Sequence, residues 1–188
     1  MLKNYLFCKK LLKYFLFPIM IIAGLWFSYL YIYGNFHKID KDLYRSAQLN
    51  TYNMPYYIQK NQIKSILNLR KDIHKQWYIN ELRISKELNV THYDFGISDR
   101  GSISVEQMDK IVKIMEDAPK PLLIHCKAGS DRTSLAAALY LYAIKHEKNP
   151  QRAISIIYGH FPWLGSRTVA MDKSFELYKK NKESNLTK

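Results

Sequence analysis

The chain has 188 residues, which is enough for one domain of ordinary size with a buried hydrophobic core. Its two cysteines, Cys8 and Cys126, lie far apart in the sequence, which argues against a disulfide framework and against a cysteine-based zinc site. The formal net charge is +13, and part of this surplus suits an anionic substrate or an anionic lipid surface. No recognised nucleic-acid-binding motif accompanies the charge, so we expect no nucleic-acid partner.

Residues 1–13 form a basic flank, and residues 14–36 contain no charged side chain. At about 1.5 Å per residue, this apolar segment reaches roughly 34 Å as a helix, which is enough to cross a bilayer core of roughly 30 Å. Trp26, Tyr29, Tyr31 and Tyr33 crowd its C-terminal half, as in the aromatic belt of a membrane interface. We therefore predict one N-terminal transmembrane helix. A buried core helix is the alternative interpretation.

A cleaved signal peptide is a second alternative for this segment. The apolar stretch exceeds the roughly 7–15 residues of a signal core, and no Ala-x-Ala site follows it, so we favour an uncleaved, single-pass signal anchor. The basic residues on its two sides are Lys3, Lys9, Lys10 and Lys13 before it and Lys38, Lys41 and Arg45 after it. The positive-inside rule then favours an extracytoplasmic (periplasmic) position for the rest of the chain.

The rest of the chain alternates strand-like and helix-like segments, without an internal repeat. We predict a strand and turn over 40–48, a short helix over 54–61, strands over 65–69 and 90–95, helices over 75–88 and 105–117, a buried strand over 121–124, and helices over about 131–146, 151–159 and 167–180. This alternation predicts an α/β domain over 37–180, in which helices flank a central, largely parallel sheet. A polar tail follows over 181–188.

The segment 125–133, His-Cys-Lys-Ala-Gly-Ser-Asp-Arg-Thr, joins the last buried strand to a buried helix. A loop curled at a helix N-terminus points backbone N–H groups inward, and the helix dipole adds positive charge, so we expect a phosphate cradle here. Gly129 permits the tight curl. The same field favours the thiolate form of Cys126. Arg132 can grip two phosphate oxygens with its planar fork.

Each residue of this segment has an expected role. Cys126 is the nucleophile, Arg132 stabilises charge in the transition state, and Thr133 donates its hydroxyl to the sulfur when the phosphocysteine is hydrolysed. His125 orients the loop through hydrogen bonds. The expected phosphate-binding residues are Lys127, Ala128, Gly129, Ser130, Asp131 and Arg132. Two alternatives are a buried structural cysteine and a rhodanese-type sulfurtransferase loop, although the arginine of the latter usually comes one residue sooner.

With five residues between Cys126 and Arg132, the segment resembles the Cys-x5-Arg protein tyrosine phosphatase superfamily, and it is most similar to the small bacterial dual-specificity-type branch. Residues 43–48 (Leu-Tyr-Arg-Ser-Ala-Gln) and 66–70 (Ile-Leu-Asn-Leu-Arg) resemble that branch as well. Ser134 departs from it, because many members have glycine there. The resemblance implies a phosphotyrosine phosphatase-like fold and chemistry that needs neither a metal nor a cofactor.

The resemblance also implies a general acid, because the family places an aspartate on a mobile loop upstream of the cysteine. Residues 96–102 form such a loop, between a predicted strand and a helix that opens at Ser104. We assign Asp99 as the acid that protonates the leaving oxygen and as the base that later activates water. Glycines on both sides would let the loop close. Asp94 is the alternative, although it lies within the strand pattern, where a salt-bridge or strand-end role is more ordinary.

Together these features predict a membrane-anchored, cysteine-dependent phosphatase that hydrolyses phosphate monoesters. The leading substrate is phosphotyrosine, with phosphoserine or phosphothreonine, in proteins. A phospholipid or inositol phosphate is the alternative, because Lys127 adds charge inside the loop and the anchor keeps the site near a bilayer. An inactive phosphate-binding module is a second alternative, which the complete set of expected active-site residues disfavours. We predict that residues 160–163 form a packing cluster at the end of a helix. A role in the substrate pocket is the alternative. The sequence leaves the oligomeric state open.

Overall fold

The computed structural model describes residues 12–186, and the chain divides into one compact unit that ends at Tyr33 and another that begins at Gly34. In the first unit, a π-helical turn (η1, Leu12–Leu16) leads into α2 (Phe17–Ile32). The window Lys13–Leu30 is long and apolar enough to cross a membrane, and none of it is buried. By length and composition, this segment is a candidate membrane span.

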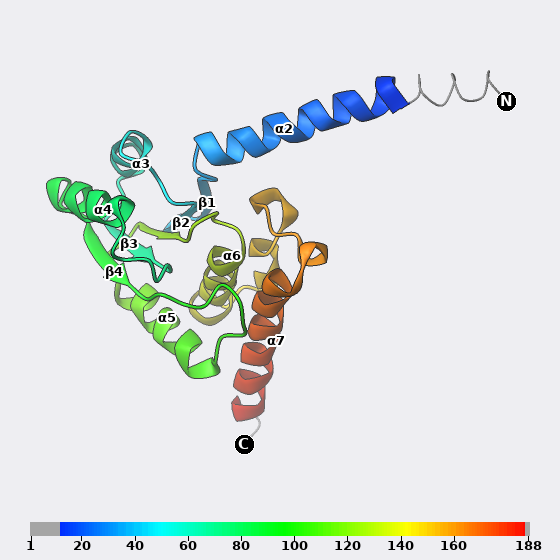
Figure 1. Ribbon diagram of the computed structural model, residues 1–188. Coiled ribbons are helices and arrows are strands. Elements are labelled where there is room, and N and C mark those ends of the chain that lie inside the picture. The colour runs from blue at the N-terminus through cyan, green and yellow to red at the C-terminus, as the bar shows by residue number, and fades with distance from the viewer. Residues whose placement is uncertain (1–11, 187–188) are drawn as a thin grey trace. The chain divides into compact units, whose positions relative to one another are not determined.

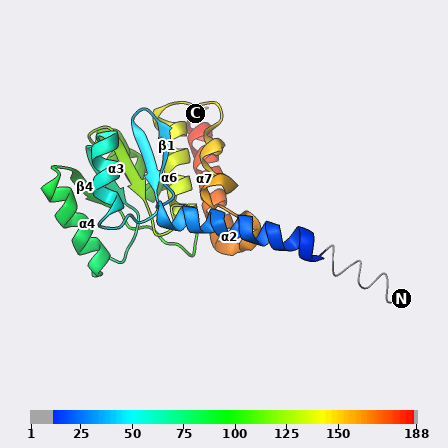
Figure 2. The ribbon, with the colours of Figure 1, turned by 90° about the horizontal axis from the view of Figure 1, so that it is seen from above.

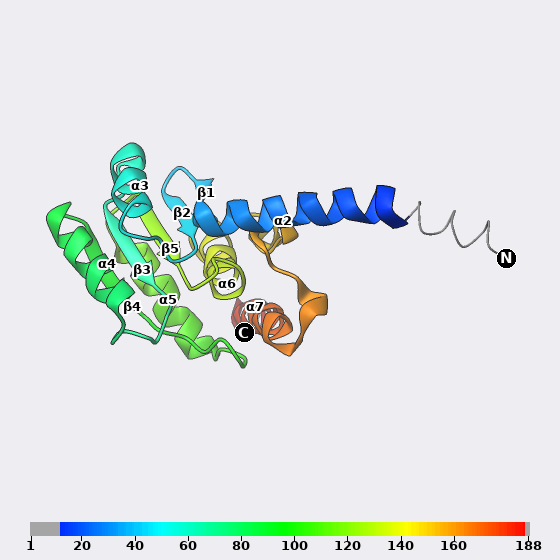
Figure 3. The same cartoon turned by 45° about the horizontal axis from the view of Figure 1, so that its top comes forward.

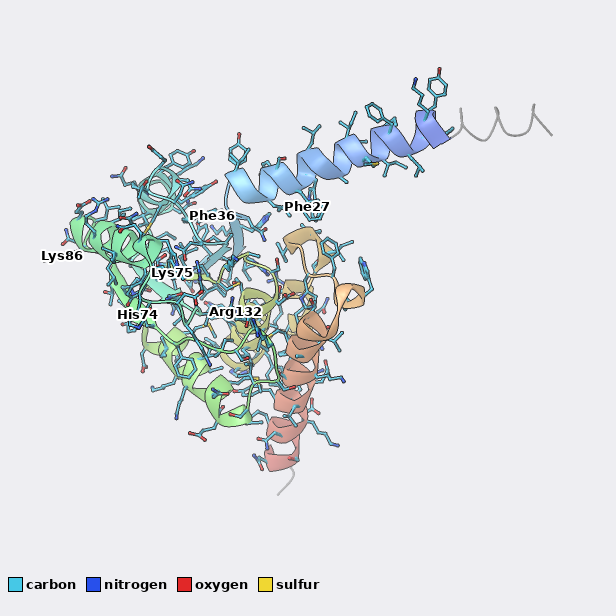
Figure 4. The ribbon with its side chains drawn as sticks, viewed as in Figure 1. Phe27, Phe36, His74, Lys75, Lys86 and Arg132 are labelled. Carbon is cyan, nitrogen blue, oxygen red and sulfur yellow. The ribbon has the colours of Figure 1, made fainter. Side chains whose placement is uncertain are left out.

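The helix ends earlier than the predicted span over 14–36. Gly34 and Asn35 both adopt left-handed backbone conformations, with φ of 71° and 46°, and such residues commonly end helices. Phe36, labelled in Figure 4, stacks on the ring of Tyr57, with 4.0 Å between the ring centroids. The last residues of the predicted span therefore belong to the second unit and help to form its core.

The second unit contains a five-stranded sheet in the order β1-β2-β5-β3-β4. The strands are β1 (His37–Asp40), β2 (Leu43–Ser46), β3 (Ser65–Asn68), β4 (Thr91–Asp94) and β5 (Leu122–His125). β2, β5, β3 and β4 are parallel, whereas β1 pairs with β2 in the antiparallel sense. The sheet is thus mixed, and the prediction of a largely parallel sheet missed its edge strand. Between the two strands, the Asp40 carboxylate accepts a hydrogen bond from the backbone N–H of Asp42, and this tight turn reverses the chain.

Helices cover both faces of this sheet, as Figures 1, 2 and 3 show. The helices are α3 (Asn53–Asn61), α4 (Gln76–Glu87), α5 (Val105–Asp117), α6 (Asp131–Leu139) and α7 (Ser166–Leu186). Side chains alternate along each strand, so Leu123 packs with α3 and α4, while its neighbours Leu122 and Ile124 pack with α5, α6 and α7. α6 is buried from Thr133 to Leu139, and its three alanines let it lie close to the sheet.

Most of the predicted helices are present, and the α5 N-terminus carries the expected cap. Ser104 and Gln107 form a capping box there. The prediction of a helix over 151–159 was wrong. Two 3₁₀ turns, η3 (Pro150–Ala153) and η4 (Ile156–Tyr158), occupy this region because Ser155 between them is extended. Further along, η2 (Tyr140–Ile144) is a π-helical turn, η5 (Pro162–Leu164) is another 3₁₀ turn, and α7 continues into the expected polar tail as far as Leu186.

The parallel arrangement decides where a site can form. The loops that follow β2, β3, β4 and β5 all leave the sheet at the carboxyl ends of their strands, and these ends lie at one edge. In open α/β sheets, ligands bind at this edge. The segment after β5, at the centre of the sheet, is the one that contains Cys126.

Candidate active site

The loop from Cys126 to Ser130 curls tightly between β5 and α6. Gly129 lies at its closest approach to the neighbouring strand and has a φ of 69°, in the left-handed region. A Cβ atom on Gly129 would lie 2.5 Å from the backbone nitrogen of Ala47 and 2.7 Å from the carbonyl oxygen of Ser46. No side chain fits there, so the expected requirement for glycine is confirmed by both space and conformation.

Groups outside the loop hold its carbonyl oxygens. The backbone N–H of Gln48 donates to the oxygen of Lys127 (3.2 Å), and the side-chain amide of Asn35 donates to the oxygen of Ala128 (3.1 Å). Arg45 donates to the oxygen of Gly129 (2.6 Å). In a trans peptide the N–H points opposite to the C=O, so the amides that follow these carbonyls point to the other side of the loop. A row of such amides is what an anion site requires.

A cavity of about 170 Å³ opens at this loop, and its lining comes from three separate parts of the chain. The residues that line it are Asp99, Cys126, Lys127, Ala128, Asp131, Arg132 and Met171. The structure therefore brings together three residues that the sequence analysis selected, Asp99, Cys126 and Arg132. Met171 of α7 was not predicted, since its place in α7 resembles that of any core methionine.

Cys126 is 3% exposed and is a free thiol at the base of this cavity. Arg132, labelled in Figure 4, donates to the carbonyl oxygens of Leu69 (3.3 Å) and Ile97 (3.5 Å). These bonds hold the guanidinium between the loop after β3 and the loop that contains Asp99. Among residues 12–186 no carboxylate lies within ion-pair distance of Arg132, so its charge is available to an anion in the cavity.

The side chains of Thr133 and Asp131 differ in their hydrogen-bond partners. The hydroxyl of Thr133 is fully buried and has no hydrogen-bond partner in the described part of the chain. An unsatisfied buried hydroxyl is costly and marks a position that calls for a functional explanation. The Asp131 carboxylate, by contrast, is held by His160 Nδ1 at 2.9 Å, and His160 Nε2 bonds to Asp172 at 2.9 Å. His160 thus ties α7 to the loop, a contact that the sequence analysis missed.

The two candidate acids have different surroundings. Asp99 lines the cavity, its side chain is 56% exposed, and its closest cation is Arg100, 4.0 Å away on the surface. Asp94 lies at the end of β4, where it accepts hydrogen bonds from Asn68 (2.8 Å) and from the hydroxyl of Tyr78. Asp94 therefore joins two neighbouring segments, and only Asp99 is positioned to face a substrate in the cavity.

The loop over 96–104 is fixed at its ends and open in its middle. Ile97 and Ile103 are both buried, and the N–H of Ile103 donates to Ser174 of α7 at 2.8 Å. Gly96 packs so closely that a Cβ atom there would lie 2.8 Å from the carbonyl oxygen of Arg70, whereas Gly101 has open space around it. The glycine before Asp99 therefore serves close packing, and any freedom of movement lies on the side of Gly101.

His125 is buried beside a carboxylate that the sequence analysis did not select. His125 Nε2 lies 3.0 Å from the Oε1 atom of Glu81 in α4, and its Nδ1 lies 3.4 Å from the Cys126 carbonyl oxygen. Glu81 is only 3% exposed and also binds His92 Nε2 at 2.8 Å. A signal for Glu81 was present in the sequence, because it follows Trp77 at i+4 on the apolar stripe of its helix.

The network around Glu81 affects its ionisation. Burial alone would raise the pKa of Glu81, but His125 and His92 outweigh this effect and hold the pKa well below its ordinary value of 4.5. In the unfolded chain this carboxyl group titrates near that ordinary value. The ionised carboxylate therefore stabilises the folded state above about pH 4.5, and this contribution is lost as the pH falls further.

Replacing Glu81 with glutamine removes one half of this buried ion-pair network and should cost about 3–5 kcal/mol. We expect the unfolding free energy of the wild type to fall as the pH is lowered below about 4.5, and that of Glu81→Gln to fall less steeply. Urea denaturation in detergent at a series of pH values measures both. Glu87→Gln, which breaks an exposed pair with Arg83 on the same helix, is the matched control and should cost less than about 1 kcal/mol. Parallel curves for the Glu81 variant and the wild type would refute the linkage.

A buried thiol beneath a curled loop, an arginine six residues later and an aspartate on a facing loop are the features expected of the Cys-x5-Arg protein tyrosine phosphatase superfamily, and the comparisons place the chain in its small dual-specificity-type branch. The chain belongs to the family described as "Polymorphic toxin system, DSP-PTPase phosphatase", whose model matches residues 43–146. This match extends from the start of β2 to just beyond η2 and so contains the loop, Asp99 and most of the sheet.

Known relatives agree with this assignment. The chain is similar to the dual specificity protein phosphatase TpbA of Pseudomonas aeruginosa, with 28% identity over 113 residues, which are 59% of this chain and 48% of TpbA. It is 29% identical over 90 residues to the mouse dual specificity protein phosphatase CDC14A, covering 48% of this chain and 14% of that protein. The chain thus matches about half the length of TpbA and a small part of CDC14A.

Solved structures support the fold. The catalytic domain of the Saccharomyces cerevisiae PP-IP phosphatase SIW14, in complex with citrate, superposes with a TM-score of 0.61 at 20% identity, covering 81% of this chain and 90% of that one. A putative phosphatase from Shewanella putrefaciens gives 0.64 at 14% identity, with 79% and 90% coverage. A cysteine-to-serine variant of TpbA in complex with pTyr gives 0.54 at 20% identity, with 77% and 90% coverage.

Proposed function

We propose that Cys126 attacks the phosphorus of a phosphate monoester in line with the leaving oxygen. The S–P bond forms as the P–O bond breaks, and the carboxylic acid of Asp99 passes its proton to the departing oxygen. The loop amides and the fork of Arg132 stabilise the equatorial oxygens. The observation that carries this proposal is the single cavity lined by Asp99, Cys126 and Arg132.

The second half of the reaction releases the enzyme. Water attacks the phosphocysteine, the Asp99 carboxylate takes a proton from that water, and the S–P bond breaks to give inorganic phosphate and the Cys126 thiolate. The unpartnered hydroxyl of Thr133 is available to donate to the departing sulfur. Because Arg132 and the amides supply the positive field, the cycle uses no metal ion and no cofactor.

Replacing Cys126 with serine should abolish turnover, since serine lacks the acidity of the thiol, while phosphate binding persists because the amides and Arg132 remain. Turnover of an aryl phosphate and binding of inorganic phosphate measure the two effects. Cys8→Ser is the matched control and should turn over substrate like the wild type. Appreciable activity in the Cys126 variant would identify a different nucleophile and end the proposal.

The acid assignment can be tested by varying the leaving group. Asp99→Asn should slow the hydrolysis of a poor leaving group, such as an alkyl or phenyl phosphate, by about 10²–10⁴-fold, and that of a nitrophenyl phosphate far less. Asp94→Asn is the control, because Asp94 instead bonds to Asn68 and Tyr78. Any loss of hydrolysis rate in this variant should not depend on the leaving group. If the Asp94 variant shows the dependence and the Asp99 variant does not, the two roles are reversed.

The leading substrate we propose is phosphotyrosine in proteins, together with phosphoserine or phosphothreonine. The names of the relatives support this choice, since TpbA and CDC14A are dual specificity protein phosphatases and a TpbA variant was solved in complex with pTyr. A phospholipid or inositol phosphate is the second candidate. It is favoured by Lys127, which adds a cation to the cavity lining, and by the candidate span.

We further propose that the apolar helix α2, preceded by the basic flank over 1–13, anchors the phosphatase domain to a membrane. The length of the span and the absence of any buried residue in the window Lys13–Leu30 support this proposal, because an exposed apolar helix is unfavourable in water. The lysines before the span favour an extracytoplasmic phosphatase domain, which protease added to cells with a permeabilised outer membrane would digest.

The anchor and the substrate can be tested together with the full chain and lipid vesicles. We expect the protein to float with the vesicles and to remain with them at high salt, whereas Ile22→Lys/Leu25→Lys should weaken this association because charges within a span are costly. Phosphate release from a phosphotyrosine peptide and from vesicles that contain phosphatidylglycerophosphate or a phosphoinositide separates the substrate classes. Exclusive turnover of the lipids would replace the leading substrate with the second candidate.

A further inference from the structure

Arg45 is a fully buried arginine in the middle of β2, within the segment 43–48 that the catalytic cycle leaves without a role. It lies in register with Ile124 of β5, two residues before Cys126. Its neighbours on the same face of the sheet are aliphatic, and a β2 position of this kind is ordinarily filled by valine or isoleucine. A guanidinium there calls for a physical explanation.

The charge of this guanidinium is not neutralised by a carboxylate within ion-pair distance, as far as residues 12–186 are concerned. Its hydrogen-bond partners are the carbonyl oxygens of Ala153 (2.7 Å), Gly129 (2.6 Å) and Ser130 (3.3 Å) and the hydroxyl of Ser134 (2.9 Å). The ring of Tyr158 covers one face, with its centroid 4.0 Å from the guanidinium carbon. All of these groups are uncharged, and an unpaired buried charge is expensive, so Arg45 is retained at a cost in stability.

The contacts of Arg45 are with the far side of the phosphate loop. It holds the carbonyl oxygens of two consecutive residues, Gly129 and Ser130, and the trans peptide geometry then turns the N–H groups of Ser130 and Asp131 away from it. One side chain therefore fixes two peptide planes in the orientation that an anion in the cavity needs. On the side away from the loop, the carbonyl oxygen of Ala153 in η3 accepts a hydrogen bond from the same guanidinium and so helps to fix its position.

Burial lowers the pKa of Arg45 to about 10, so the side chain remains charged at neutral pH. The ionisable groups whose charges act on it are Tyr158, Cys126 and Asp131, and His37 on β1 is repelled by it. The hydrogen bonds to Gly129 and Ser130 place this positive charge directly behind the loop that begins at Cys126, whereas Arg132 lines the cavity on the other side.

We propose that Arg45 is a positioning residue, which holds the phosphate loop curled and keeps a fixed positive charge behind the nucleophile. This inference rests on the proposed function of the same site. Ser134 fits into it, because the serine hydroxyl that stands where many relatives have glycine is one of the acceptors that orient the guanidinium. Arg45 does not touch the substrate; it acts through the loop.

The test compares Arg45→Lys and Arg45→Met with the wild type in the full chain in detergent. Lysine keeps the charge but lacks the two separate terminal nitrogens that bond Ala153 and Gly129, whereas methionine removes both charge and donors. Both variants should bind inorganic phosphate more weakly. Their kcat/KM for an aryl phosphate should fall by about 100-fold, because a small displacement of the loop misplaces the substrate relative to the nucleophile. The pH midpoint for alkylation of Cys126 should move upward in Arg45→Met and much less in Arg45→Lys.

Arg152→Met is the matched control, because Arg152 also donates to a backbone carbonyl, that of Ile39, but does not contact the phosphate loop. It should retain phosphate affinity and the alkylation midpoint. If Arg45→Met does not fold, Arg45→Lys decides the question through its phosphate affinity. A folded Arg45 variant with wild-type phosphate affinity and an unchanged alkylation midpoint would overturn the proposal. Active Cys126→Ser protein would instead overturn the catalytic cycle, so the two failures are distinguishable.

Discussion

The close contact between Gly129 and the backbone at the end of β2 is the constraint on which the active site depends. A strand that leaves the sheet must turn sharply to start a helix at once, and here it does so against Ser46 and Ala47, where there is no room for a side chain. The turn exposes carbonyl groups on its outer side, and those groups require donors. Arg45, Gln48 and Asn35 supply them, each from a different position along the chain.

This arrangement explains why the inner and outer sides of the phosphate loop have such different neighbours. The inner side of the loop lines the cavity together with Cys126 and Arg132, whereas on its outer side the carbonyl oxygens of Gly129 and Ser130 are hydrogen-bonded to Arg45. Further groups fix its ends: Glu81 holds His125 before the loop, and His160 holds Asp131 after it. In the proposed cycle, this preorganised geometry lets neutral amides and one guanidinium stabilise the phosphoryl group.

The local features of the site could be predicted from the sequence, and the distant ones could not. Cys126, Gly129 and Arg132 follow one another in a strand–loop–helix pattern, so short-range chemistry was sufficient to place them. Glu81 and His160 come from remote segments, and which buried polar group will meet the loop depends on how the sheet is assembled. Arg45 lay in a segment that resembled the family, but the direction of its side chain depended on the pairing of β2 with β5. The same limit applies to the fold: β1 and the 3₁₀ turns depend on single turn residues, whereas the long periodic helices were evident.

Asn35 connects the beginning of the second unit with its active site. It comes shortly after the last residue of α2, and its amide group bonds both to Ala128 in the phosphate loop and to the carbonyl oxygen of Tyr158. A shortened protein that began at His37, where the sheet starts, would lack this donor and the aromatic ring of Phe36. The sensible place to cut lies before Gly34, since the short segment that looks like a linker supplies one donor to the phosphate loop and one ring to the core.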